Sequence, residues 1–121
     1  MKTSQDPRHI KRQHVVQELF KIQFHIQPVS ERAQEIVSNL ESIDERIHRA
    51  APEFPVDKIN RIDLSILRLA VFELVIEKKE PVNVIIDEAV ELGKEFGGEA
   101  SPSFINGALG NIISHEQSSK N

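Results

Sequence analysis

The chain has 121 residues, enough for one compact domain, and carries a formal net charge of −4. It contains no cysteine, which excludes disulfides and thiolate metal sites. Residues 1–6 are polar and no apolar signal segment follows them, so we expect a cytoplasmic protein without a secretory leader. The negative charge argues against electrostatic binding of nucleic acid over the whole surface.

The first 25 residues are basic, with a net charge of about +3 against about −7 for the remainder. Asp6 followed by Pro7 is typical of a helix start, and the pattern predicts a helix over residues 7–25. Free N–H groups and the helix dipole favour anions at such a start. A local phosphate site is one interpretation of this segment, and an ordinary solvated helix start is the other.

The three cations Arg8, Lys11 and Arg12 lie in line with the apolar stripe of this first helix. The stripe therefore changes from basic to apolar after about two turns. We expect the apolar part to dock on the core and the basic part to lie just beyond the core edge.

The middle of the chain predicts one long helix over residues 31–49, capped by Ser30, after a break at Gln27-Pro28. Its apolar residues form a one-sided stripe. Residues 51–56 contain two prolines and form a connection, in which we expect Phe54 to cover the core.

Residues 59–76 form the most apolar stretch and predict a central helix buried by other helices, with Asn60 or Asp63 as its N-cap. Interspersed charges and too short an apolar length exclude a membrane span. Arg61, Ser65 and Arg68 form a narrow polar strip, which predicts ion pairs with carboxylates of a neighbouring helix.

Two more helices are predicted over residues 84–96, capped by Asn83, and over 102–114, separated by Gly97-Gly98, where we expect a left-handed residue. The carboxylates of the first, Glu88 and Glu95 among them, are interpreted as a solvated face. Phe104 lies in the first turn of the last helix, where it either stacks on a base or joins the core.

These elements predict an all-α, compact helical bundle in a single domain, residues 1–121, with frayed tails at 1–5 and 115–121. The histidines show no metal-ligand spacing, and no nucleophile or phosphate-loop motif is present. We therefore expect a binding module, without catalytic residues, metal or cofactor.

Two segments resemble the NusB family of bacterial transcription antitermination factors: INRIDLSILRLAVFEL, and EPVNVIIDEAVELGKEFGGEASPSFINGALGNI. The resemblance is close over residues 59–113, and the first helix is similar to the family's Arg-rich opening helix. The region between residues 27 and 59 is shorter than is usual, so we expect a shortened member that lacks one family helix. Ala100, Pro102 and Ser103 also depart from the family pattern near the last helix start.

The resemblance implies two small helical sub-bundles and binding of boxA, a short single-stranded RNA element, together with NusE, a ribosomal small-subunit protein. It implies an indirect link to the RNA polymerase elongation complex, and action in ribosomal RNA operons. Carried over by position, the implied partner-binding residue is Asp63. The implied RNA-binding residues are Arg8, His9, Lys11, Arg12, Ser101 and Phe104.

Two alternatives remain open at this point. One is a helical protein-binding regulatory domain with weak or lost RNA binding, favoured by the shortened middle and by Ala100. The other is part of an RNA-modifying enzyme, since some RNA cytosine methyltransferases carry a similar domain ahead of a catalytic one. We rank the enzyme last because no catalytic domain follows in this sequence.

Overall fold

The computed structural model describes residues 6–119, which form six α-helices, a 3-10 turn and a π-helical turn, without a strand in this range. This confirms the all-α prediction. None of the described helices is long and apolar enough to cross a membrane. The elements are α1 Pro7–Ile22, α2 Glu31–Ser38, α3 Leu40–Ala50, η1 Val56–Lys58, α4 Arg61–Val71, η2 Phe72–Glu77, α5 Val82–Phe96 and α6 Ser101–Ser119.

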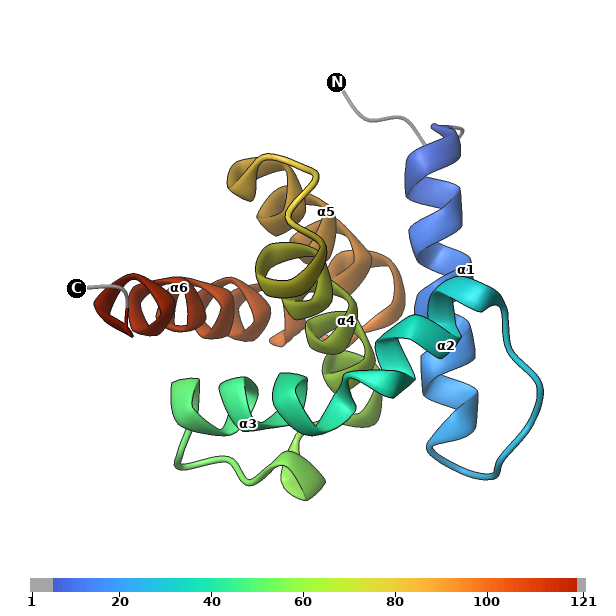
Figure 1. Cartoon of the computed structure of the whole chain (residues 1–121), viewed down its shortest axis with the longest axis horizontal. Coiled ribbons are helices and arrows are strands. Elements are labelled where there is room, and N and C mark those ends of the chain that lie inside the picture. The colour runs from blue at the N-terminus through green and yellow to red at the C-terminus, as the bar shows by residue number, and fades with distance from the viewer. Residues whose placement is uncertain (1–5, 120–121) are drawn as a thin grey trace.

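Helix α4 is the centre of the fold, as the run of apolar residues predicts (Figure 1). It contacts α1, α3, α5 and α6, and all but three of its residues are buried. The Asn60 side chain caps it by accepting from the N–H groups of Ile62 and Asp63. Its continuation η2 is a wider π-helical turn that ends at Lys78, whose φ of 56° is left-handed.

The middle of the chain differs from the prediction, because two helices occupy the place of one. The chain breaks at Asn39, whose side chain donates to the carbonyl oxygen of Glu35 at 2.8 Å. Asparagine side chains compete for backbone partners in this way and so interrupt helices. The single helix over residues 31–49 is therefore wrong, and the expectation of a missing helix, which depended on it, loses its basis.

The turn between α5 and α6 also corrects the sequence analysis. Neither Gly97 nor Gly98 is left-handed, and Gly97 has an extended backbone with φ −92°. Glycine is required at position 97 for steric reasons instead, because a Cβ there would lie 2.5 Å from the Cβ of Ser101. Helix α6 continues to Ser119, so residues 115–119 are not a frayed tail, and the predicted frayed tails 1–5 and 120–121 lie outside the described residues.

Candidate functional site

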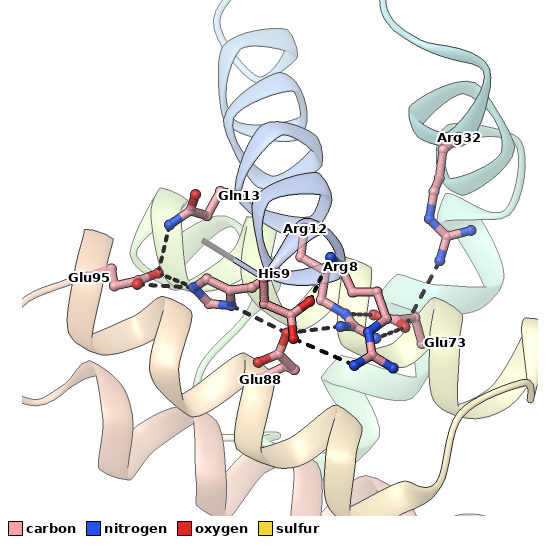
Figure 2. Close-up of polar contacts among 9 residues, drawn as sticks. Arg8, His9, Arg12, Gln13, Arg32, Glu73, Glu88 and Glu95 are labelled. Carbon is pink, nitrogen blue, oxygen red and sulfur yellow. Dashed lines mark hydrogen bonds and ion pairs between the residues drawn. The ribbon is translucent and has the colours of Figure 1, made fainter. Parts of the chain in front are cut away.

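Arg12 does not project from the start of α1 as the sequence analysis expects, because it is only 8% exposed. Its Nε and Nη2 donate to the two oxygens of Glu73 at 2.9 and 2.8 Å, and Nη1 donates to Glu88 at 2.9 Å. Figure 2 shows this guanidinium between the two carboxylates. The prediction that Arg12 lies beyond the core edge is wrong because η2 and α5 surround it with carboxylates.

His9 is buried one turn earlier on the same face of α1, with 2% exposure. Its Nδ1 lies 3.3 Å from an oxygen of Glu88, and its Nε2 lies 2.8 and 3.0 Å from the oxygens of Glu95 (Figure 2). A neutral imidazole has one N–H, so His9 can donate to both carboxylates only as the doubly protonated ring; as a neutral ring it donates to one and accepts from a protonated carboxyl of the other. His9 thus faces α5, and Glu88 belongs to no solvated face.

The ion pairs extend from α1 to α2. Arg32 of α2 donates to Glu77 at 2.6 and 2.9 Å and lies 4.0 Å from Glu73. Hydrogen bonds from Arg32 hold the pKa of Glu77 below its usual range. The hydrogen bonds that Arg12 donates to Glu73 raise the pKa of Arg12 above the ordinary value for arginine. We call the four buried members, His9, Arg12, Glu73 and Glu88, the buried charge network; Arg32, Glu77 and Glu95 lie at its edge, at partly or fully exposed positions.

Two cations at the start of α1 remain exposed, Arg8 and Lys11. Arg8 lies 3.5 Å from Asp6 at the helix cap, and Lys11 makes no ion pair within residues 6–119. A groove of about 540 Å³ adjoins Arg8, and its other charged lining residues are Asp6, Arg12, Glu80, Asp87 and Glu88. Carboxylates outnumber arginines in this groove, so the groove itself disfavours an anion. The cations available to an anion are Arg8 and Lys11 on the exposed side of α1.

Asp63 and Ser101 come together where α4 and α6 begin, although 38 positions separate them in the sequence. Asp63 is 7% exposed, and its Oδ1 has no hydrogen-bond partner among residues 6–119. Burial raises the pKa of the Asp63 carboxyl, and a hydrogen bond with the Ser101 side chain acts in the opposite sense. Ser101 itself is buried and accepts from the Gly98 N–H at 2.9 Å. Both residues thus help to join α4 to the α5–α6 turn.

Replacing Asp63 by Asn is expected to stabilise the protein at neutral pH, because the variant buries no charge. A raised folded pKa means that the parent loses stability as pH rises through the ordinary value of 3.8 toward the folded value. The stability advantage of Asp63→Asn should therefore grow over this range and then level off. Urea unfolding at several pH values measures it, and an advantage that shrinks with rising pH contradicts the assignment.

Phe104 is half-buried and packs edge-on against Phe54, with ring centroids 5.7 Å apart and planes at 83°. Phe54 is 49% exposed, so it covers Phe104 more than it covers the core, contrary to expectation. Phe104 thus packs against the core and keeps part of its ring exposed, so the structure leaves both alternatives for this residue in place.

The polar strip of α4 is confirmed in part. Arg68 donates to both oxygens of Asp44 at 2.9 and 2.8 Å, as the predicted interhelical ion pair requires. Ser65 is buried and accepts from the Gln23 side chain at 2.8 Å. Arg61 is exposed and has an aromatic partner instead of a carboxylate.

Sequence reasoning missed Glu73 and Glu88 as partners of Arg12. A charge inside the most apolar stretch was the available signal for Glu73, because a buried carboxylate needs a cation. No group of three or more acidic or histidine side chains that could hold a metal ion occurs within residues 6–119.

The described residues thus form an all-helical body with two exposed cations at the start of α1 and a half-exposed aromatic ring at the start of α6. The NusB family profile matches residues 27–114. The transcription antitermination protein NusB of Chloroflexus aggregans is 34% identical over 110 residues, which cover 83% of this chain and 73% of that protein. The chain belongs to the NusB family.

Other relatives match a shorter segment. NusB of Geotalea uraniireducens is 47% identical over 79 residues, 65% of this chain. The chain spans only 54% to 59% of the length of such relatives. Among solved structures, NusB of T. maritima has a TM-score of 0.78 at 32% identity, covering 94% of this chain and 93% of that one. A crystal structure of NusB and NusE with dsRNA has a TM-score of 0.75 at 21% identity, and shows the fold alone.

Proposed function

We propose that this protein is a transcription antitermination factor that binds single-stranded boxA-type RNA together with NusE. The observation that carries the proposal is the match to T. maritima NusB over nearly the whole of both chains. Relatives named as antitermination proteins support it. Such a factor acts on nascent transcripts in the cytoplasm, reaches RNA polymerase through its partners and catalyses no reaction.

The exposed cations Arg8 and Lys11 are the residues of α1 that we assign to the RNA backbone. His9 and Arg12 have their hydrogen-bonding groups turned to carboxylates, so they support the helix that carries Arg8 and Lys11. Phe104 offers a half-exposed ring, the kind of surface on which an RNA base stacks. Two exposed cations give modest affinity alone, which makes a protein partner physically useful.

Ser101 and Asp63 stay as weaker assignments. Both are buried, at 4% and 7% exposure, so RNA or NusE would reach them only at the edge of the first turn of each helix. Ser101 acts in this proposal by holding the α5–α6 turn that carries Phe104. A loss of NusE affinity in Asp63→Asn, with RNA affinity unchanged, would support the partner contact.

Replacing Arg8 and Lys11 together by Ala is expected to weaken RNA binding about tenfold at moderate salt, because two phosphate contacts are lost. The slope of log affinity against log salt should fall by about 1.4. Fluorescence anisotropy with boxA-type RNA and NusE across a salt series measures both. The matched control is the exchange Arg8→Lys with Lys11→Arg, which keeps the charges and should keep most of the affinity.

The second candidate is a protein-binding regulatory domain with weak RNA affinity. The burial of His9 and Arg12 favours it, because it removes half of the implied basic RNA-binding start. NusE binding without any RNA-dependent gain in affinity would establish this second function and overturn the first.

A further inference from the structure

A second groove, of about 610 Å³, lies at the other end of α1. The end of α1, the end of α3, η1 and the start of α4 form it. These segments lie in the lower half of Figure 1, away from the start of α1. Its polar lining residues are Gln23, His48, Asp57, Arg61 and Arg68. No residue in this lining is among those that the family resemblance implies for RNA or NusE.

Arg61 is the principal cation of the groove. Its guanidinium lies 4.8 Å from the centre of the Phe24 ring, and it has no carboxylate partner within residues 6–119. Phe24 is 57% exposed and is braced from the side by Phe20, whose ring centroid is 5.1 Å away. A solvent-facing aromatic ring with a planar cation over it is a surface on which nucleic acid bases stack.

The charges of the lining leave Arg61 available to an anion. Asp57 is the carboxylate that lines this groove, it makes no ion pair with Arg61 within residues 6–119, and Arg68 is neutralised by Asp44. The groove at the start of α1 is more acidic, with more carboxylates than arginines. Gln23 donates to Arg61 O and Ser65 Oγ, which fixes its amide and leaves its oxygen as an acceptor for a base edge.

We propose that this groove, here called the Arg61 groove, binds a second segment of single-stranded RNA, with a phosphate at Arg61 and a base on the exposed part of the Phe24 ring, which adjoins the groove through Arg61. The inference rests on the proposed RNA-binding function and lengthens its footprint along α1, which is about 24 Å long for its 16 residues. An acidic peptide would satisfy Arg61 but would leave the exposed Phe24 ring unused, so RNA fits the observations better.

The test compares two RNAs with NusE present. One is a boxA-type RNA of about 12 nucleotides, and the other is extended to about 24 nucleotides, so that it can reach from the site at the start of α1 to the Arg61 groove. The parent should bind the longer RNA more tightly. Arg61→Ala and Phe24→Leu should each lower the affinity for the longer RNA roughly fivefold or more and leave the affinity for the short RNA unchanged. Both residues are exposed, so neither variant should alter folding. Lys79→Ala, which removes an exposed cation outside the groove, is the control and should keep the gain.

The outcomes separate the two claims. If the parent binds neither RNA, the proposed function and the Arg61 groove both fall. If the parent binds both RNAs equally, or if Arg61→Ala keeps the whole gain, only the groove assignment is overturned. Competition by an acidic peptide that depends on Arg61, without any gain from the longer RNA, would assign the groove to a protein ligand and would also overturn it.

Discussion

Replacing Arg12 by Ala is expected to lower the free energy of unfolding by about 3–5 kcal/mol, because Glu73 and Glu88 would stay buried without their cation. Both carboxylates are less than 5% exposed, so water cannot compensate for the loss. An effect of this size is a large fraction of the stability of an ordinary domain, about 5–15 kcal/mol. Urea unfolding followed by circular dichroism measures it.

Two controls show whether the loss comes from unpaired charge. Arg8→Ala removes an exposed arginine of the same helix and should change stability by less than about 0.5 kcal/mol. Combining Arg12→Ala with Glu73→Gln and Glu88→Gln removes the uncompensated charges and should restore part of the stability. An Arg12→Ala variant as stable as Arg8→Ala would contradict the structural role of the buried charge network.

Replacing Gly97 by Ala is expected to cost about 2–3 kcal/mol, because the α5–α6 turn has no room for a Cβ. The added atom would lie 2.5 Å from the Cβ of Ser101 and 2.8 Å from the carbonyl oxygen of Gly93. Neither is the end of a flexible side chain, so the turn itself must move. Since this turn places Ser101 and Phe104, RNA affinity should fall along with the unfolding midpoint.

Gly98→Ala is the matched control, because a Cβ at Gly98 meets nothing within 4 Å and the backbone there is not left-handed. It should be neutral or slightly stabilising, since alanine restricts the unfolded chain more than glycine does. Thermal unfolding of the two variants side by side provides the comparison. Equal melting temperatures for Gly97→Ala and Gly98→Ala would show that the turn tolerates the extra atom.

The fold class and the starts of α1, α2 and α4 could be predicted from the sequence because they depend on local signals. The predicted Asn83 cap is wrong, since α5 begins at Val82 and Pro81 is its N-cap. The apolar run of α4 and the caps Asp6, Ser30 and Asn60 are each readable within a few residues. The break at Asn39 escaped prediction because the apolar stripe continues across it. Only the competing hydrogen bond to Glu35 interrupts the helix there.

The candidate site was harder to predict because its charges are paired across the chain. Arg12 lies 61 positions from Glu73 and 76 from Glu88, and no local pattern announces such a pair. The sequence therefore predicted that Arg12 is available to RNA together with Arg8 and Lys11. In the structure Arg12 is buried, and only Arg8 and Lys11 of the three are exposed. Arg61 was interpreted as an ion-paired residue for the converse reason, since the sequence does not show that Phe24 lies beneath it.

At the start of α1, we expect Arg8 to contact RNA whereas Arg12 stays paired with carboxylates. Nitrogen-edited NMR of the arginine Nε–H groups tests this difference most directly, during an RNA titration with NusE present. The predicted result is that the Arg8 signal shifts with added RNA, while the Arg12 signal, held on Glu73, exchanges slowly with water and stays in place. An Arg12 signal that moves as RNA is added, beside an Arg8 signal that does not, would contradict the account.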